Sequence, residues 1–383
     1  MNKYYRTYAD IDLDAIRGNI TNMQKGLEKG VKTCAVIKAD GYGHGAVELA
    51  ENLKDIVDFF AVACMEEALE LRHSHVTLPI LILAYTHKSF YEDAIREDVR
   101  LTIYDLDSAE KLSKAARKLN KTAKIHIKLN TGMNRIGFKP TEENKQIIQK
   151  ISRLKGIEIE GIFTHLHSAD EKDLTSAKEQ IKTFRRFTDD LADMGIHIPI
   201  RHCANSAGTI LMKEADFDMV RMGISLYGLY PSSYVRKLKL LPGMSLYSHV
   251  TMVKRIEKGD TVGYGAAFTA PQAMTIATVS VGYADGYLRN LSNKGYVLIN
   301  GQKAKIVGNV CMDQIMVDVS RIKDVKVDDV AVLIGRSGNQ VITMEEIAAL
   351  GLTINYEFAC GITRRVTRRY IRKGKVVSIR ESC

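Results

Sequence analysis

Short apolar runs alternate with amphipathic segments over residues 33–223. The segments between the runs, such as 108–120 and 176–195, carry apolar residues at helical spacing and close with Asn or Gly, as helix ends tend to. This alternation predicts parallel strands joined by helical crossovers. Eight such units favour an α/β fold with a closed eight-stranded (β/α)8 barrel of the TIM type over an open sheet. The eight predicted strands are 33–39, 58–64, 78–84, 100–105, 124–130, 158–165, 197–203 and 218–223.

After residue 240 the chain is dominated by β-branched segments that are separated by glycine or polar turns. Short runs of this kind with few helical stretches predict a mainly antiparallel β domain. The change of pattern falls near 238–246, so we expect a barrel domain over residues 1–238 and a C-terminal mainly-β domain over residues 239–383. The segments that carry this expectation are 246–257, 274–286, 303–320 and 327–335.

The charge of the chain bears on its partners. The formal net charge of the 383 residues is +10, and much of it lies in residues 364–380. That stretch predicts a two-stranded hairpin turning at Lys373-Gly374, with its basic residues on a solvated face. No zinc-finger spacing or RNA-binding aromatic motif accompanies it. We therefore expect no nucleic-acid partner and instead small anionic ligands, which a positive surface attracts.

Cysteine spacing and hydropathy bear on the compartment. The six cysteines form no C-x-x-C pair, which argues against a disulfide framework and against a zinc site. The opening residues lack the charged-then-apolar layout of a signal peptide, and the longest apolar run, 78–85, is too short to cross a bilayer. We expect a cytoplasmic protein without a membrane segment.

Lys38 ends the first apolar run, where ligands meet the loops of an eight-stranded barrel. Burying an ammonium costs several kcal/mol unless the group is paired or loses its proton. One interpretation is that its amine reaches solvent or a neighbouring carboxylate. The other is a reactive amine for Schiff-base chemistry with an aldehyde cofactor. Residues that could bind a ligand or take part in a reaction also stand at the ends of other predicted strands, at 130–135, 165–170, 205–206 and 221–223.

The exit of the eighth predicted strand suggests a phosphate site. Gly223 and Ile224 are expected to offer free backbone N–H groups where phosphate commonly sits in eight-fold barrels. Ser206 is expected to add a hydroxyl group from the preceding loop. A glycine after a strand equally fits plain turn chemistry.

Two histidines at the end of the sixth predicted strand raise a different enzyme class. His165 and His167 are two residues apart, so they point the same way, and His202 is a possible third ligand for a metal-dependent barrel hydrolase. The pair lies on the sixth strand rather than early in the chain, and no carboxylate is well placed to complete the site. We expect no metal.

The run AVIKADGYGHG at 35–45 closely resembles the cofactor-binding signature of the bacterial alanine racemases. Members of this family use pyridoxal 5′-phosphate on an eight-stranded barrel that is followed by a β domain. The resemblance covers essentially the whole chain in family order. Further blocks that carry it are ADIDLDAIRGNI, HIKLNTGMNRIGF, FTHLHSADE, CANSAG, MVRMGISLYGL, VGYGAAF, VGYADGYLR, GNVCMDQIMVDV and INYEFACGITRRV.

The resemblance implies racemisation of alanine by two acid/base groups, which supplies D-alanine for cell-wall peptidoglycan. Lys38 is implied to hold the cofactor covalently and then to serve as the acid/base on one face of the substrate α-carbon. A single base tends to return the proton to the side it left, so a second group is needed on the opposite face. By resemblance this group is Tyr264, contributed by the other subunit, which implies a homodimer.

The remaining site residues are carried over in the same way. Arg221 is implied to face the pyridine nitrogen of the cofactor, and because arginine does not readily give up a proton, it should leave that nitrogen unprotonated. Arg135 is implied to contact the cofactor phenolic oxygen and the substrate carboxylate. Lys128 lies close by and is often carbamylated in the family. The other matched positions are Tyr42, His165, Asn205, Ser206, Gly223, Ile224 and Tyr356 for the cofactor, and Met312, Asp313 and Tyr283 for the substrate and its entrance.

Several alternatives stay open. Serine racemases attached to membrane domains share this catalytic region, and a pocket discriminates against one hydroxyl by only about 1–3 kcal/mol. A non-catalytic pyridoxal-phosphate-binding protein needs neither the β domain nor Tyr264. A decarboxylase of related fold should carry an acidic residue where Arg221 stands. Four positions depart from the family pattern, namely His167, Ser168, Phe358 and Thr367.

Overall fold

The computed structural model describes residues 4–381, which group into two compact units. The barrel unit comprises Arg17–Gly41 and Ala46–Leu241. The β unit comprises the described residues up to Ile16, the short segment Tyr42–Gly45, and the described residues from Pro242 onward. The change of pattern expected near 238–246 contains the observed division after Leu241. The two short segments from the first part of the chain belong to the β unit, however, and not to a barrel domain over 1–238.

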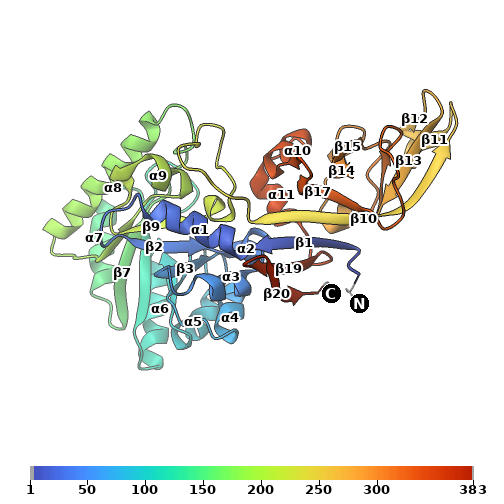
Figure 1. Cartoon of the computed structure of the whole chain (residues 1–383). Helices are drawn as coiled ribbons and strands as arrows, with labels where there is room; N and C mark the ends of the chain where they lie inside the picture. Colours follow the sequence, from blue (N-terminus) through green and yellow to red (C-terminus); the bar gives the residue numbers. More distant parts are fainter. Residues whose placement is uncertain (1–3, 382–383) are drawn as a thin grey trace. The chain divides into compact units, whose positions relative to one another are not determined.

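The barrel unit is built on eight parallel strands, which confirms the predicted fold class and each of the eight predicted strands (Figure 1). Their order is β8-β7-β6-β5-β4-β3-β2-β9. Two backbone hydrogen bonds join the ends of this series, from Asp218 N to Arg201 O (3.0 Å) and from Arg221 N to Ala204 O (3.1 Å). The strands are β2 (Lys32–Val36), β3 (Phe59–Val62), β4 (Ile80–Ile82), β5 (Val99–Ile103), β6 (Ala123–Lys128), β7 (Ile157–Phe163), β8 (Ile200–His202) and β9 (Met219–Met222).

The two helical segments that the sequence predicts are present, with ends within two residues of the predicted ones. The predicted helices at 108–120 and 176–195 correspond to α6 (Leu106–Lys118) and α8 (Thr175–Asp193). Asp105 caps α6 because its carboxylate accepts a hydrogen bond from Ser108 N (2.7 Å). The other helices are α1 (Leu13–Gln24), α2 (Lys38–Tyr42), α3 (Ala46–Leu53), α4 (Met65–His73), η1 (Lys88–Phe90), α5 (Tyr91–Arg96), α7 (Glu142–Ser152), α9 (Ser206–Leu211), η2 (Lys213–Ala215) and η3 (Ile224–Tyr227).

The β unit contains a ten-stranded sheet, which confirms its predicted mainly-β character. The path through the sheet is β15-β14-β17-β10-β1-β19-β20, and β13, β16 and β18 pair beside it. The strands are β1 (Thr7–Asp12), β10 (Met244–Ile256), β11 (Thr261–Val262), β12 (Phe268–Thr269), β13 (Met274–Val279), β14 (Tyr296–Ile299), β15 (Gln302–Lys305), β16 (Ile315–Asp318), β17 (Val330–Ser337), β18 (Gln340–Ile342), β19 (Thr367–Arg372) and β20 (Lys375–Arg380). The helical segments are η4 (Tyr264–Ala266), η5 (Tyr283–Asp285), η6 (Arg289–Leu291), α10 (Met344–Leu350) and α11 (Asn355–Gly361).

Strand β1 explains why the start of the chain belongs to the β unit. It pairs antiparallel with β10 and parallel with β19, in the middle of the sheet. Its side chains alternate between buried and partly exposed positions. This pattern suits a sheet with one face buried, whereas parallel barrel strands are buried on both faces. The sequence ranges missed this pairing because the partners of β1 lie more than 200 residues away.

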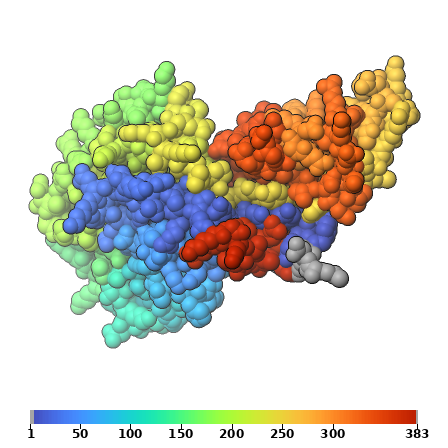
Figure 2. All heavy atoms as spheres, viewed as in Figure 1, coloured from blue at the N-terminus to red at the C-terminus, as the bar shows by residue number. Residues whose placement is uncertain are grey.

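The hairpin predicted over 364–380 is confirmed as β19 and β20, but one of its basic residues, Arg368, is buried and not on a solvated face. The hairpin turns at Lys373 and Gly374, which both have positive φ (49° and 70°), as a tight two-residue hairpin turn requires. Strand β20, drawn in dark red, lies at the surface (Figure 2) and exposes Val376, Val377 and Ile379. Among the described residues, no helix has the length and apolar character needed to cross a bilayer.

Candidate active site

Lys38 stands directly after a barrel strand, as predicted, but the local backbone differs from the expected strand end. β2 ends at Val36, and Lys38 begins a short turn in which Ala39, Asp40 and Gly41 have positive φ (52°, 51° and 60°). Consecutive left-handed residues are unfavourable for L-amino acids, and such backbone strain tends to occur at functional sites. The turn therefore sets the direction in which the Lys38 side chain leaves the barrel strand.

Three hydrogen bonds hold this strained turn. Gly41 N donates to Ile37 O (2.8 Å), and Ala39 N donates to the carboxylate of Glu67 on α4 (2.7 Å). Asp40 accepts from the first residue of α3, Ala46 N (3.0 Å). Glycine suits position 41, where φ is +60° and a Cβ would lie 2.6 Å from a methyl group of Leu49 and 3.3 Å from Ala46 N. Lys38 itself is half-buried, because the strand ends at Val36, before it.

Four predicted site residues come together around His165. The pKa of His165 lies well below its usual value because of burial, followed by the positive charges of Arg221, Arg135, Lys128 and Lys38. These side chains follow or belong to strands β2, β6, β7 and β9, whose carboxyl ends meet at one mouth of the barrel. The mouth is therefore strongly positive, and His165 is neutral within it.

Lys128 is buried almost as deeply as Arg221, with 3% of its surface exposed. Its Nζ donates to Leu129 O (2.7 Å) and Ile136 O (3.4 Å), and it lies 5.5 Å from the centre of the Phe163 ring. Burial, with the charges of Arg221 and Arg135, lowers the pKa of Lys128 to about 7. A substantial fraction of this amine is therefore uncharged at neutral pH.

Arg221 is buried on β9 and its guanidinium is held on one side. Nη2 donates to Thr164 O (2.8 Å) and Cys203 O (3.1 Å) and lies 3.4 Å from His165 Nδ1. Nη1 donates to His202 Nδ1 (2.9 Å). All of these hydrogen bonds involve Nη1 and Nη2, so the orientation of the guanidinium is fixed by the two backbone carbonyl groups and the His202 ring.

The predicted phosphate site differs in one respect from expectation. Gly223 N is not free, because it donates to Ser206 Oγ (2.9 Å), and Ser225 N lies 3.4 Å from the same oxygen. Since this oxygen accepts both bonds, the hydroxyl hydrogen of Ser206 is directed elsewhere and can donate to an anion. Ile224 begins the helical turn η3 beside it. Asn205 caps α9: its Oδ1 accepts from Gly208 N (3.0 Å), and its Nδ2 donates to Leu166 O (3.1 Å).

Gln180 on α8 is a site residue that could not be selected from the sequence. Its Nε2 donates to Thr131 Oγ1 (3.2 Å) and to His165 O (3.1 Å), while its Oε1 accepts from His167 N (3.1 Å). The side chain is buried and ties the loop after β6, which carries Arg135, to the loop after β7. A glutamine in an amphipathic helix carries no sequence signal of such a role.

The histidines proposed as metal ligands have other partners. His202 contacts Arg221 through Nδ1 and His126 through Nε2 (2.8 Å), and His167 Nε2 lies 3.2 Å from Ser176 Oγ. Across residues 4–381, no three His, Cys, Asp or Glu side chains form a group that could hold a metal ion.

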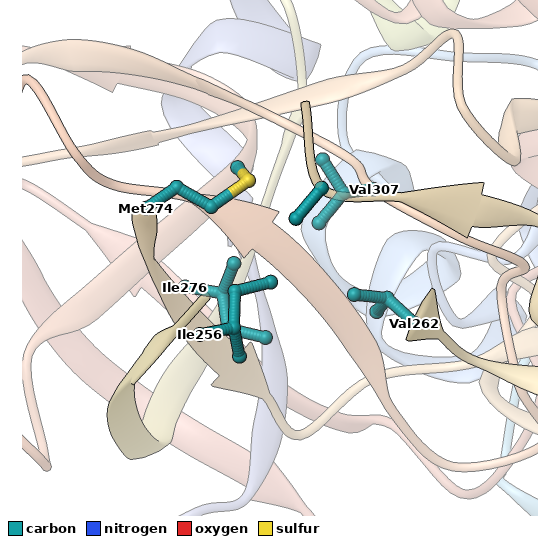
Figure 3. Close-up of a cluster of buried hydrophobic side chains, with 6 residues drawn as sticks. Ile256, Val262, Met274, Ile276 and Val307 are labelled. Carbon is teal, nitrogen blue, oxygen red and sulfur yellow. The ribbon is translucent and has the colours of Figure 1, made fainter. Parts of the chain in front are cut away.

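In the β unit, Tyr264 lies on an anchored loop but is itself 75% exposed. Val262, two residues earlier, packs into the apolar cluster formed with Ile256, Ile276 and Val307, to which Met274 also belongs (Figure 3). Asn309 Nδ2 donates to Tyr264 O (2.8 Å). The backbone is therefore fixed, and the phenol projects from the surface.

Tyr283, Met312 and Asp313 lie together in the β unit. Tyr283 N donates to Cys311 O (3.0 Å) and Ala284 N donates to Met312 O (3.0 Å), so the two loops run side by side. Asp313 accepts a hydrogen bond from Arg365 Nη2 (2.7 Å). Tyr283 and Met312 are both exposed.

Tyr42 and Tyr356 are also neighbours in the β unit, with ring centroids 6.3 Å apart. The segment after Tyr42 is held by Arg368, whose Nε and Nη2 donate to Gly43 O (3.2 and 3.1 Å). Burial, with the nearby Cys360, raises the pKa of Tyr42 above its usual range. Its hydroxyl is therefore protonated and able to donate a hydrogen bond.

The four departures from the family pattern have ordinary surroundings. His167 is exposed and Ser168 is partly exposed beside the loop that Gln180 holds. Phe358 is fully buried against Tyr287. Thr367 begins β19 and pairs with Tyr8 of β1.

Comparison with known proteins gives one family across the chain. Residues 11–231 match the family described as "Alanine racemase, N-terminal domain", and residues 243–370 match "Alanine racemase, C-terminal domain". The alanine racemase of Clostridium tetani is 46% identical over 99% of both chains. A solved alanine racemase of Clostridium difficile 630 has a TM-score of 0.95 at 42% identity, covering 98% of both chains. Its complex with cycloserine has a TM-score of 0.93 at 40% identity, covering 100% of both chains.

Proposed function

The chain belongs to the alanine racemase family, and from this premise we propose that it interconverts L- and D-alanine with pyridoxal 5′-phosphate as cofactor. The observation that carries the proposal is the set of four cations, Lys38, Lys128, Arg135 and Arg221, around His165. A positive site of this kind suits a phosphorylated cofactor and the carboxylate of an amino acid.

The residues present fit this cofactor. The Ser206 hydroxyl and the backbone at Ile224 are suited to its phosphate, and the half-buried amine of Lys38 is suited to its aldehyde. In the β unit we assign Tyr42 and Tyr356 to the phosphate. When bound, pyridoxal phosphate supplies an electron-withdrawing ring that stabilises negative charge at the substrate α-carbon.

Two side chains of the protein move the α-proton in this proposal. The Nζ of Lys38 takes or returns it on one face, and the phenol of Tyr264 does so on the other, so that the two enantiomers exchange. Tyr264 is exposed on a fixed loop, which suits a residue that serves the site of a second copy.

Arg221 and Arg135 orient the reacting groups. The hydrogen bonds of Arg221 within the described chain involve Nη1 and Nη2, so its Nε–H would be the donor to the ring nitrogen of a bound cofactor, and a guanidinium would leave that nitrogen unprotonated. Arg135 is exposed at the barrel mouth and binds the substrate carboxylate. Lys128, when it carries a carbamate, supplies a negative charge beside Arg135. By resemblance to the family, we assign Met312, Asp313 and Tyr283 to the substrate and its entrance.

The direct test combines the protein with pyridoxal phosphate and follows α-proton exchange of L-alanine in D₂O together with formation of D-alanine. L-Serine is run in parallel, and we expect alanine to react faster. Borohydride treatment followed by peptide mass analysis should place the label on Lys38. The Lys38→Ala variant should lose activity, whereas Lys32→Ala, which alters an exposed lysine at the start of the strand preceding Lys38, should keep it. A wild-type protein that binds the cofactor but forms no D-alanine would refute the proposal.

A second test addresses the homodimer. Lys38→Ala and Tyr264→Phe subunits should each have little activity alone, but mixed dimers should regain one intact site. Random mixing in equal amounts should then restore about a quarter of the wild-type activity. No recovery in verified mixed dimers would mean that Tyr264 serves its own subunit. In the cell we assign the enzyme to the cytoplasm, where it supplies D-alanine for peptidoglycan.

A further inference from the structure

Behind Arg221, a chain of hydrogen bonds crosses the barrel interior. Arg221 Nη1 contacts His202 Nδ1 (2.9 Å), and His202 Nε2 contacts His126 Nδ1 (2.8 Å). His126 Nε2 contacts Glu160 Oε2 (3.1 Å), and Arg100 Nε donates to the same oxygen (3.0 Å). We propose that Glu160 is a positioning residue, which fixes the direction of this chain and thereby the orientation of Arg221.

This series of hydrogen bonds lies in the barrel interior and not at the protein surface. Its members lie on five consecutive strands, β5 to β9. Both histidines are fully buried, and the side chain of Glu160 is 12% exposed. Gly161 is required beside His126, because a Cβ at position 161 would lie 2.4 Å from His126 Nδ1. The His202 ring is held by stacking on Phe163, with ring centroids 4.8 Å apart.

Glu160, at the end of the hydrogen-bond chain remote from Arg221, is ionised because of the positive charges around it. Desolvation alone would raise the pKa of Glu160, but the hydrogen bonds from His126 and Arg100 and the charge of Arg100 outweigh it and lower the pKa to about 2. Lys124 adds a further positive charge 3.9 Å away. Glu160 is therefore a carboxylate, which can only accept hydrogen bonds.

The ionised state of Glu160 determines which atom donates and which accepts in every hydrogen bond between Glu160 and Arg221. Burial, as the largest cause, lowers the pKa of His126 and of His202, so both rings are neutral. His126 must carry its hydrogen on Nε2 to donate to Glu160, which leaves Nδ1 as an acceptor. His202 must then donate from Nε2, which leaves its own Nδ1 as an acceptor for Arg221. A guanidinium has donors only, so only this arrangement satisfies both ends.

Without the Glu160 carboxylate, both histidine rings can instead carry their hydrogen on Nδ1. His202 Nδ1–H would then point at an N–H of Arg221, and two facing donors push the guanidinium away. The inference rests on the proposed function only in assigning Arg221 to the cofactor ring nitrogen. Its effect on catalysis is exerted through Arg221, since Glu160 does not touch the reacting groups.

The first test reads the hydrogen positions directly, by ¹⁵N NMR of the holoenzyme labelled at histidine. His126 and His202 should both be neutral with hydrogen on Nε2 and should not titrate between pH 6 and 8.5. Assignment uses His202→Gln and His126→Gln variants. If either ring in the wild-type protein carries hydrogen on Nδ1 or on both nitrogens, the proposal is overturned. This reading does not require racemase activity, so it stands apart from any failure of the proposed function.

The second test is Glu160→Gln, because an amide presents either an oxygen or an NH₂ group to His126 and no longer fixes the direction. We expect a mixture of hydrogen positions on both rings, a loss of kcat of at least tenfold, and a change in KM for alanine of less than twofold. Glu158→Gln alters an exposed carboxylate on the same strand and should leave both rings and kcat unchanged. A folded Glu160→Gln enzyme with wild-type kcat and unchanged rings would refute the assignment.

Discussion

Replacing Lys128 with methionine tests how strongly the barrel suppresses the charge of this amine. The pKa falls from the ordinary 10.5 to about 7, and at about 1.4 kcal/mol per pKa unit this corresponds to about 5 kcal/mol between the protonation states. Below pH 7 the ammonium is buried at nearly this full cost. Because the unfolded chain binds more protons than the folded one between pH 7 and 10.5, stability rises with pH in this window.

The size of the effect can be worked out at two pH values. At pH 7 the buried amine costs about 4 kcal/mol relative to an uncharged side chain, and at pH 9 the cost falls to about 2 kcal/mol. Methionine has no such cost. The difference in unfolding free energy between Lys128→Met and wild type should therefore shrink by about 2 kcal/mol from pH 7 to pH 9. Urea unfolding of cofactor-free protein in CO₂-free buffer measures it.

Lys139→Met serves as the control, because Lys139 is exposed beyond the same loop. The difference in unfolding free energy between Lys139→Met and wild type should not change over this pH range. If the Lys128→Met difference is equally constant, then Lys128 keeps an ordinary affinity for protons and the reasoning fails. Added ¹³C-bicarbonate should further stabilise wild type and give a carbamate resonance that Lys128→Met lacks, since only an uncharged amine attacks CO₂.

Four further substitutions have expected outcomes. Tyr264→Phe should lower racemisation by about 10²–10⁴-fold while the folded state and cofactor binding persist, as measured by D-alanine formation and absorbance. Gln180→Leu should raise KM for alanine more than it lowers kcat, because it releases the loop that carries Arg135. An unchanged KM would contradict the role of Gln180 in holding that loop. Gly282→Ala should lower the melting temperature sharply, since the new Cβ would lie 2.3 Å from carbonyl oxygens of the 311–312 loop. Gly18→Ala, which has open space within α1, should instead stabilise by about 0.5–1 kcal/mol.

The eight barrel strands could be predicted because each is a continuous apolar run, and parallel barrel strands are buried on both faces. The positions of Lys38, Arg135 and Arg221 at strand ends followed from the same reasoning. β1 could not be placed, because its alternating pattern gives its type but not its distant partners. The half-burial of Lys38 depends on a strained turn that residue types do not reveal.

Hydrogen-bond partners were the least accessible part of the site. Gly223 was expected to have a free N–H, but the neighbouring loop brings the Ser206 hydroxyl to it. Gln180 and Glu160 lie on a helix and a strand as ordinary polar residues, and their roles exist only through contacts with loops and strands far along the chain. Spacing along one element predicts which face a residue occupies, whereas a buried polar network is determined by several elements at once.

The basic side chains at the barrel mouth repel one another. Burial leaves Lys128 partly uncharged at neutral pH, and the fold must stabilise the positive charge that remains. Lys128 donates to two backbone carbonyl groups, and Arg221 donates to two more and to a neutral histidine. Carbonyl groups and a neutral ring satisfy the donors but bring no net negative charge. The one carboxylate of the network, Glu160, lies two histidines away from Arg221. The mouth thus keeps its positive charge for an anionic cofactor and substrate, while Arg221 is held in place by a carboxylate too remote to take its proton.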